Sequence, residues 1–232
     1  MIVVLCPTRG RPDAAFEMAK SFRETAALFS TELILVIDRD ELARGAYELI
    51  PSLTNTSSSE LLPPNPVRVM VVKGGSLTEA TNEAAKRVWN DDCIIGHVGD
   101  DHKFVTPGWD KTVTQVLDKP GVAYGNDLLQ GPVLPTAVFM SSVIPRTLGW
   151  FALPGTRHMK IDTVWKDLGV KTGTLRYLPN VIIEHLHPSV GKSPEDEGYE
   201  RARQSRRDDA RAYKRWLATS DDDIQKLIEE MK

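Results

Sequence analysis

The strongest constraint on the fold is an alternation between short apolar runs and segments with helical spacing. Apolar runs over residues 2–6, 33–37, 67–72 and 93–98 each have the length and composition of a buried strand. Between them, apolar side chains recur every three or four residues, as on the inner face of an amphipathic helix. Strands that alternate with helices form right-handed crossovers and a mainly parallel sheet. The sequence therefore predicts an α/β fold with a Rossmann-like central sheet between helices.

The helical segments of the first half have recognisable starts. One helix is expected to begin at Asp13, with its inner face formed by Phe16, Ala19, Phe22 and Ala26. A short helix is expected over 41–49, and Ser76 and Glu79 have the spacing of a capping box. Residues 51–66 are rich in Pro, Ser and Asn and are expected to form a mobile surface loop.

The second half of the chain is less regular. Helices are expected over 110–117 and 160–168, with strands near residues 122 and 138 and again over 174–184. The tail is expected to be helical over 199–217, with a new helix starting at Ser220.

Composition limits the classes of function. With 232 residues, of which 41% are hydrophobic and 26% charged, the chain suits one large domain. Its net charge of −3 provides no overall positive field that would attract nucleic acid or an anionic membrane. Cys6 and Cys93 lie in apolar runs, which indicates buried thiols rather than the disulfide framework of a secreted protein. This pattern favours a reducing cytoplasm. No apolar run reaches the roughly 18 residues of a membrane span, and no signal peptide is recognisable, so a cytoplasmic protein is expected.

Polar residues gather where the predicted strands end. In open α/β sheets, ligands bind beyond the carboxyl ends of the strands. Thr8, Asp38 and residues 73–75 and 100–101 all follow such ends. Asp38 is suited to accept a hydrogen bond from a nucleobase or a ribose hydroxyl, or alternatively to pair with a nearby arginine, Arg39 or Arg44.

Four cations occupy the loops at this edge, where they would offset the charge of a diphosphate. They are Arg9, Arg11, Arg39 and Lys73. The alternative for each one is an ordinary solvated loop charge.

Asp100 and Asp101 are adjacent carboxylates at the end of a buried strand. Such neighbours repel each other unless positive charge lies close, and a hard divalent cation supplies it. The alternative is an acidic turn that caps the helix after Pro107.

His185 and His187 alternate on a strand-like segment, so one of them faces the site while the other faces away. A histidine among carboxylates favours Mn²⁺ over a zinc cage, since no Cys or His set has zinc spacing. The alternative is an ordinary histidine of the core or the surface that holds no metal and has its hydrogen bonds satisfied.

Several segments together resemble the nucleotide-binding half of GT-A glycosyltransferases of the family-2 type. They are residues 3–12, 37–38, 81–85 and 99–101 with 107–110, and the resemblance extends over residues 1–188. In that family the first loop holds the nucleobase, a D-x-D motif holds ribose and metal, and a late histidine completes the metal site. Carried over, the donor contacts are Pro7, Thr8, Arg9, Arg11, Asp38, Lys73, Gly74, Asn82 and Asp100. Asp101 becomes the metal ligand, together with His187 or alternatively His185.

The chain departs from the family at Gly99, which stands where D-x-D has its first aspartate. This leaves the ribose or second metal contact open, with Asp100 as its replacement. The resemblance also divides the chain into a GT-A domain over 1–198 and a helical extension over 199–232. Within the domain, 1–110 is the nucleotide-binding half and 111–198 the acceptor half.

Residues 156–165 resemble the segment that carries the general base in inverting members of the family. Asp162 is the matching carboxylate, and its alternative role is the N-cap of the helix with Trp165 and Leu168. The resemblance implies a hexosyltransferase that uses Mn²⁺ or Mg²⁺. It would move a sugar from a nucleoside-diphosphate sugar, with UDP favoured, to a hydroxyl with inversion.

The acceptor is left open. Similar short chains with G-D-D-H and E-H-x-H-P segments occur in actinobacteria and their phages, where glycans, small molecules or hydroxymethylated DNA bases would be acceptors. DNA is suggested by the basic residues of the tail, Arg201, Arg203, Arg206, Arg207, Arg211, Lys214 and Arg215. The alternative is a solvated helix in which Asp208 and Asp209 balance them. The rival functions are a nucleotidyltransferase and an inactive module that binds sugar nucleotides.

Overall fold

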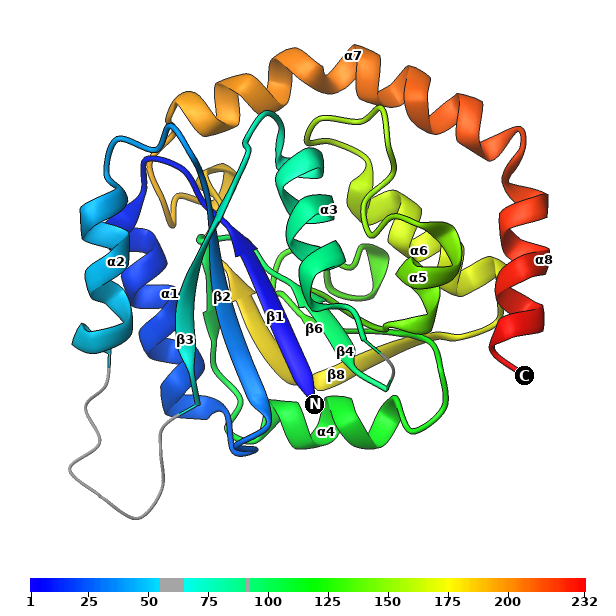
Figure 1. Ribbon diagram of the computed structural model, residues 1–232, viewed down its shortest axis with the longest axis horizontal. Helices are drawn as coiled ribbons and strands as arrows, with labels where there is room; N and C mark the ends of the chain where they lie inside the picture. The colour runs from blue at the N-terminus through cyan, green and yellow to red at the C-terminus, as the bar shows by residue number, and fades with distance from the viewer. Residues whose placement is uncertain (55–64, 91) are drawn as a thin grey trace.

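The computed structural model describes residues 1–54, 65–90 and 92–232 of the chain (Figure 1). Residues 55–64, most of the loop expected over 51–66, lie outside the described residues. Within these described residues, eight strands form one sheet in the order β3-β2-β1-β4-β7-β6-β8-β5. The strands are β1 (Ile2–Pro7), β2 (Thr31–Asp38), β3 (Val67–Val72), β4 (Ile94–His97), β5 (His102–Phe104), β6 (Val122–Asn126), β7 (Val138–Ser141) and β8 (Leu175–His185).

The sheet is mostly parallel, as the sequence predicted. Strand β1 runs parallel to both β2 and β4, and β2 runs parallel to β3. Strand β7 is antiparallel to its neighbours β4 and β6, β8 is parallel to β6, and β5 adds an antiparallel edge to β8. The carboxyl ends of β1 to β4 consequently meet at one edge of the sheet.

Helices cover both faces of the sheet. They are α1 (Pro12–Thr25), α2 (Arg44–Leu53), α3 (Leu77–Val88), α4 (Trp109–Val116), α5 (Val143–Leu148), α6 (Ile161–Lys171), α7 (Glu197–Leu217) and α8 (Ser220–Glu230), with short 3-10 turns at Gly131–Val133 and Pro188–Val190. The capping box of Ser76 and Glu79 at the start of α3 is confirmed.

Some helix starts differ from the prediction. The N-cap of α1 is Arg11, with Pro12 in the first turn, so Asp13 is not the cap. Helix α2 begins at Arg44 rather than at Glu41. The reason is that the carboxylate of Glu41 accepts N–H bonds from Gly10 and Ala43 and stays outside the helix.

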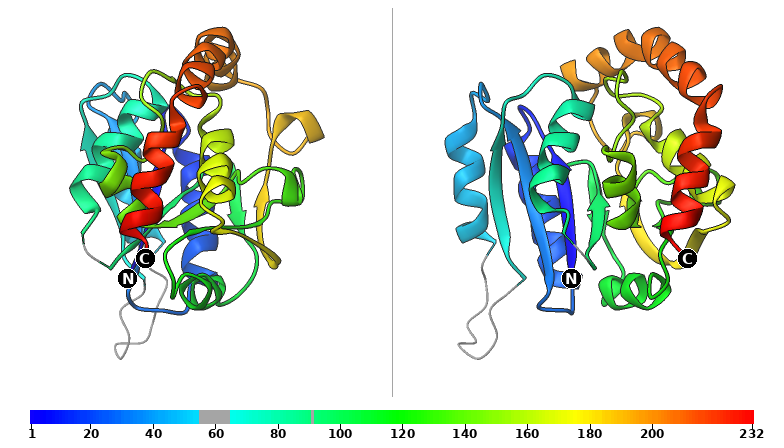
Figure 2. Two further views of the ribbon diagram at one scale, coloured as in Figure 1. Left: turned by 90° about the vertical axis from the view of Figure 1, so that its right-hand side faces the viewer. Right: turned by 45° about the vertical axis from the view of Figure 1, so that its right-hand side comes forward.

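Alternate residues of the central strands enter two separate cores. In β1, Val3 and Leu5 join the core under α3, α5, α6 and α8, whereas Val4 and Cys6 join the core under α1, α2 and α4. The result is a helix, sheet, helix arrangement in three layers, which Figure 2 shows from two further sides. Both cysteines are buried and free, in agreement with the expectation from their apolar surroundings. Among the described residues, none of the helices has the length and apolar composition that crossing a membrane requires.

Helix α7 runs over the end of the molecule at which β1 ends (Figure 1). It is held there by Asp209, which is fully buried. The Asp209 carboxylate accepts backbone N–H bonds from Arg157, His158 and Met159 at 2.8, 3.1 and 2.6 Å. Asp209 is therefore a structural anchor between α7 and the segment before α6, and it does not balance the exposed arginines.

Candidate metal and nucleotide site

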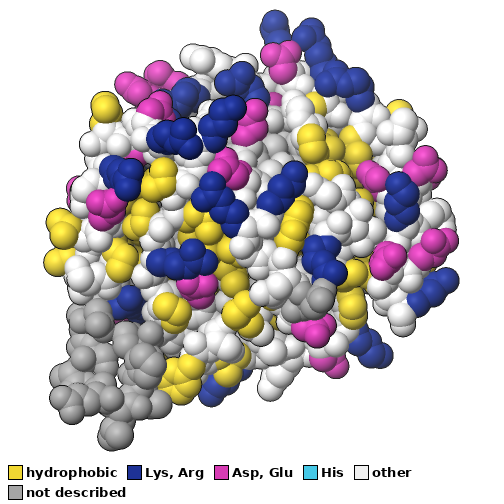
Figure 3. All heavy atoms as spheres, viewed as in Figure 1, with side chains coloured by type: hydrophobic (Ala, Val, Ile, Leu, Met, Phe, Trp, Pro, Cys, Tyr) yellow, Lys and Arg dark blue, Asp and Glu magenta, His cyan; other side chains and the backbone are white. Residues whose placement is uncertain are grey.

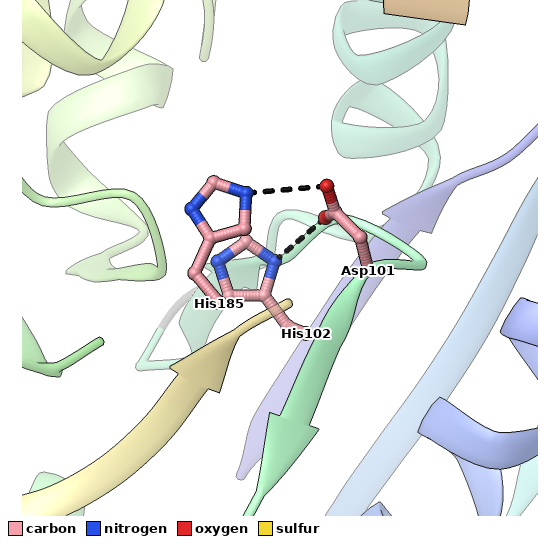
Figure 4. Close-up of side chains that lie close together, drawn as sticks. All are labelled: Asp101, His102 and His185. Carbon is pink, nitrogen blue, oxygen red and sulfur yellow. Dashed lines mark hydrogen bonds and ion pairs between the residues drawn. The ribbon is translucent and has the colours of Figure 1, made fainter. Parts of the chain in front are cut away.

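Asp101 lies in the turn after β4 and is the centre of a group of polar side chains (Figure 4). Its Oδ2 lies 3.1 Å from His185 Nε2 and accepts a 2.6 Å hydrogen bond from the Tyr199 hydroxyl. Its Oδ1 lies 3.2 Å from His102 Nδ1. Atoms able to ligate a metal on Asp101, His102 and His185 all lie within 4.8 Å of one another.

The two histidines reach Asp101 because β5 and β8 pair with each other. His102 and His185 are directly opposite in the antiparallel register, and their rings stack with centroids 4.3 Å apart. Figure 4 shows both rings facing the same carboxylate from neighbouring strands. Sequence reasoning did not assign His102, because a strand of three residues such as β5 leaves no periodic pattern.

The protonation states of the group suit a divalent cation. Burial opposes the ionisation of Asp101, but contacts with His102 and His185 hold its pKa well below the usual value. Burial lowers the pKa of His102, which keeps this ring neutral near pH 7. One carboxylate and two imidazoles form a donor set that could hold a divalent transition-metal ion.

Steric crowding explains why position 99, where D-x-D has its first aspartate, is a glycine. A Cβ at this position would collide with the Asp101 carboxylate and lie 3.2 Å from His102 Nδ1. The Gly99 N–H donates to that same nitrogen at 3.1 Å. The space that an aspartate would need is filled by the Asp101 and His102 side chains.

Asp100 turns toward the loop after β1. Its Oδ2 accepts a 2.6 Å hydrogen bond from the Thr8 hydroxyl, and its Oδ1 accepts a 3.1 Å bond from Arg11. Burial raises the pKa of Asp100 to about 6, although Arg11 and Thr8 act in the opposite direction. The two adjacent aspartates therefore have different surroundings and different pKa values.

Arg9 links the loop after β1 to the end of β2. Its guanidinium contacts Asp38 at 2.5 Å and both carboxylate oxygens of Asp40 at 2.9 and 3.0 Å. Asp38 thus pairs with Arg9, and Arg44 pairs instead with Glu48. A Cβ on Gly74 would lie 3.1 Å from Asp38, so the loop after β3 touches the same carboxylate.

A cavity of about 530 Å³ opens beside Asp101, within the size range of small-molecule sites. Part of its wall comes from the segment before α7 and from the first turn of α7, which the sequence did not indicate. Asp196 receives two hydrogen bonds of 2.5 Å from Arg11, and the Arg11 guanidinium lies 4.5 Å from the centre of the Tyr199 ring. The lining includes Arg11, Asp100, Asp101, His102, Lys192, Asp196 and Tyr199.

The protein-family models and the curated protein sequences give no match to this chain. Solved structures do match. Mannosyltransferase PcManGT from Pyrobaculum calidifontis, in complex with GDP-Man and Mn²⁺, aligns with a TM-score of 0.59 at 10% identity over 94% of this chain and 75% of that chain. The chain has the GT-A fold.

Two further GT-A structures agree. Glucosyl-3-phosphoglycerate synthase from Mycobacterium tuberculosis, with Mn²⁺, UDP and phosphoglyceric acid, gives a TM-score of 0.59 at 12% identity over 89% of this chain and 75% of that chain. S. aureus TarS 1-349 with UDP-GlcNAc gives 0.57 at 12% identity over 78% of this chain. The chain spans only 57% of that TarS structure.

The GT-A fold brings most of the predicted donor contacts to one edge. Pro7 ends β1, and the loop after it carries Thr8, Arg9 and Arg11. Asp38 ends β2, Lys73 and Gly74 follow β3, and Asp100 follows β4. Lys73 is exposed there. These roles remain predictions.

Three predicted site residues make other contacts. The Asn82 amide bonds the backbone of Phe151 and Ala152 and supports that segment. Asp162 lies in the first turn of α6, where it accepts the N–H of Thr163, and the N-cap is Lys160. His187 lies outside the Asp101 group, and its Nδ1 accepts the N–H of Ser189 at 3.1 Å.

Proposed function

We propose that this protein is a metal-dependent glycosyltransferase that moves a sugar from a nucleoside-diphosphate sugar to a hydroxyl group. One observation carries the proposal: within a GT-A fold, Asp101, His102 and His185 converge at the end of β4. Arg9 and Arg11 lie on the adjoining loop after β1, where a diphosphate would need positive charge.

The metal is proposed to be Mn²⁺. Two of the three donors are imidazoles, which suit Mn²⁺ better than Mg²⁺, an ion that prefers oxygen ligands. Asp101, His102 and His185 would hold the ion, and His187 would approach it only if its ring left Ser189. When bound, the metal would neutralise charge on the leaving diphosphate.

The donor is proposed to be a UDP-sugar, bound along the ends of β1 to β4. Asp38 would accept a hydrogen bond from the base or ribose once Arg9 turns toward phosphate. Asp100 would keep the loop after β1 in position through Thr8 and Arg11. Two of the structures that share the fold contain a UDP-sugar or UDP, which supports this choice.

Asp162 is proposed as the general base of an inverting transfer. Burial raises the pKa of its carboxyl group, which makes it a stronger base than an exposed aspartate. Its present bond to Thr163 N uses Oδ1, so Oδ2 can accept the proton of an acceptor hydroxyl.

The acceptor is proposed to carry phosphodiesters, with DNA as the first candidate. The solvent side of α7 presents Arg203, Arg207, Arg211 and Lys214 at spacings of four, four and three residues, so all four lie on one side of the helix. Figure 3 shows basic side chains gathered at the end of the molecule where α7 runs. Asp209 fixes this helix to the segment that leads into α6.

The proposal is tested by thermal unfolding with UDP, GDP, dTDP and CMP sugars, each with and without Mn²⁺. A ligand that binds only the folded protein raises the Tm. We expect one diphosphate sugar to raise the Tm only when Mn²⁺ is present, and Asp101→Ala to abolish this shift.

Other outcomes separate the rival functions. No shift with any sugar nucleotide would contradict the proposal. Stabilisation by a nucleoside triphosphate, with pyrophosphate release when a sugar phosphate is added, would indicate a nucleotidyltransferase. Metal-dependent binding without donor hydrolysis or transfer would indicate an inactive module.

A further inference from the structure

Tyr47, on α2, has a buried hydroxyl group that lies against the loop after β1. The residue is 0% exposed, and its aromatic ring packs in the core under α1, α2 and α4. The hydroxyl oxygen accepts the backbone N–H of Arg11 at 2.8 Å and lies 3.1 Å from Thr8 Oγ1. One side chain of α2 therefore contacts both ends of the loop that carries the proposed diphosphate contacts.

These contacts are part of a closed circuit of hydrogen bonds. The Thr8 hydroxyl donates its one proton to Asp100 Oδ2 at 2.6 Å. Thr8 Oγ1 can then only accept, so the Tyr47 hydroxyl donates to it. Arg11 closes the circuit, because its backbone N–H donates to Tyr47 and its Nη1 donates to Asp100 Oδ1 at 3.1 Å.

The circuit joins segments that are far apart in the sequence. Thr8 and Arg11 follow β1, Tyr47 lies on α2, and Asp100 precedes Asp101 in the turn after β4. Thr8, Tyr47 and Asp100 are all buried. Loss of one bond would leave buried polar groups without partners, so the circuit resists displacement of any member.

A second residue from the same segment holds the loop in a similar way. Glu41, which precedes α2, is 7% exposed, and its carboxylate accepts the N–H of Gly10 at 2.9 Å. Gly10 has a φ of +70°, so the loop turns at this residue through a left-handed conformation. The N–H groups of Gly10 and Arg11 are thus both bound by side chains from the segment after β2.

We propose that Tyr47 is a positioning residue for the nucleotide donor. Its hydroxyl fixes the loop after β1 so that the Arg11 guanidinium is directed at the turn that carries Asp100 and Asp101. Tyr47 acts through Thr8 and Arg11, because its own side chain is buried. This inference rests on the proposed function, in which Arg11 binds the diphosphate beside the metal.

The test uses Tyr47→Phe, which removes the hydroxyl and retains the aromatic ring. Tyr124→Phe is the matched control. Tyr124 is 2% exposed, and its hydroxyl donates to the Pro132 carbonyl at 2.8 Å. It lies on β6, three strands from β1 in the sheet, so this variant also loses a buried hydroxyl but leaves the circuit unchanged.

The first readout is backbone amide exchange in the donor-free protein, measured by NMR. The Arg11 amide should exchange roughly tenfold faster in Tyr47→Phe, because its acceptor is lost, and at the wild-type rate in Tyr124→Phe. Thr8→Val opens the same circuit from the loop side. It should also speed exchange at Arg11, and it keeps the test valid if Tyr47→Phe does not fold.

The second readout is calorimetric titration with UDP, GDP and dTDP, each with Mn²⁺. The Kd of the nucleotide that binds should rise about 3- to 10-fold in Tyr47→Phe, because a loop that is no longer preorganised must be ordered on binding. The Kd should not change in Tyr124→Phe. The affinity for Mn²⁺ alone should be the same in all three proteins, since Asp101, His102 and His185 are unchanged.

A double variant tests the route through Thr8. If Tyr47 acts through this residue, the loss of affinity in Tyr47→Phe with Thr8→Val should be smaller than the product of the two single losses. Independent losses that multiply would exclude the circuit as the route.

The outcomes distinguish this inference from the proposed function. Wild-type exchange at Arg11 in Tyr47→Phe, or faster exchange with unchanged nucleotide affinity, would overturn the role of Tyr47. Equal effects in Tyr124→Phe would also overturn it. A wild-type protein that binds none of the three nucleotides would contradict the proposed function, and the exchange comparison would still decide whether Tyr47 fixes the loop.

Discussion

The guanidinium of Arg11 makes two hydrogen bonds of 2.5 Å to the carboxylate of Asp196, 185 positions later in the chain. Both residues line the cavity beside Asp101. Arg11 is also one of the cations proposed to bind a diphosphate, so Asp196 occupies it while the donor is absent.

Asp196→Asn should therefore bind the nucleoside diphosphate more tightly, by up to about tenfold, because Arg11 loses an anionic competitor. The asparagine oxygen can still cap α7, where Asp196 now accepts the N–H groups of Gly198 and Tyr199. Calorimetric titration measures the effect. Glu197→Gln, at the next and exposed carboxylate, serves as the control. Weaker binding in Asp196→Asn would mean that Asp196 helps to form the site.

Asp209 and Asp208 are adjacent on α7 but differ in their contacts. Asp209→Ala should lower the free energy of unfolding by roughly 3 kcal/mol, because three backbone N–H groups and the Ser205 hydroxyl lose their buried acceptor. Asp208 is exposed and pairs with Arg211, so Asp208→Ala should change stability by less than about 0.5 kcal/mol. Urea unfolding of both variants compares them, and equal losses would disprove the anchor role.

His97, at the end of β4, predicts a pH dependence of stability. It is 5% exposed, and neither ring nitrogen has a hydrogen-bond partner among the residues that the structure describes. Burial, with smaller effects of His102 and His158, lowers its pKa to about 3. Below an unfolded pKa of about 6.5 the unfolded chain binds a proton that the folded protein does not, so stability falls as the pH drops from about 6.5 toward 3.

Replacement by leucine, which has a similar volume, should reduce that slope by up to ~1.4 kcal/mol per pH unit. Chemical unfolding of wild type and His97→Leu at several pH values provides the measurement. Parallel slopes for the two proteins would show that His97 does not remain neutral in the folded state.

The role of Asp162 is separable from donor binding. Asp162→Asn should lower the rate of sugar transfer by about 10²- to 10⁴-fold, the usual contribution of a general base. The Mn²⁺-dependent Tm shift with the donor should be retained, because the metal group and the loop after β1 are unchanged. Asp167→Asn, on the same helix and bonded to the Tyr213 hydroxyl, is the control. Full transfer activity in Asp162→Asn would require another base.

The basic side of α7 predicts salt-dependent binding of DNA. Replacing Arg203, Arg207 and Lys214 by glutamine should weaken binding and reduce the slope of log Kd against log salt by about 2 to 3, as three phosphate contacts are lost. Glutamines at Arg44, Lys111 and Lys119, which are exposed on other helices and loops, are the matched control. Equal binding by the two triple variants would exclude α7 as the DNA surface.

The sequence by itself determined the parallel strands β1 to β4 and the edge of the sheet at which polar side chains gather. Buried parallel strands are continuous apolar runs, so β1 to β4 and their ends are visible in the chain. Because the carboxyl ends of parallel strands meet at one edge, Thr8, Arg9, Asp38 and Asp101 were correctly grouped without knowledge of any contact.

Only the tertiary structure decided which side chains complete the Asp101 group. The alternation of His185 and His187 shows that one faces the site, but a shift of one residue in the strand register would exchange them. The register is set by the bonds of His185 N to Asp127 O and of Leu186 N to Asp101 O. His102, Asp196 and Tyr199 reach the site through pairings between distant segments, and such contacts leave no local pattern in a sequence.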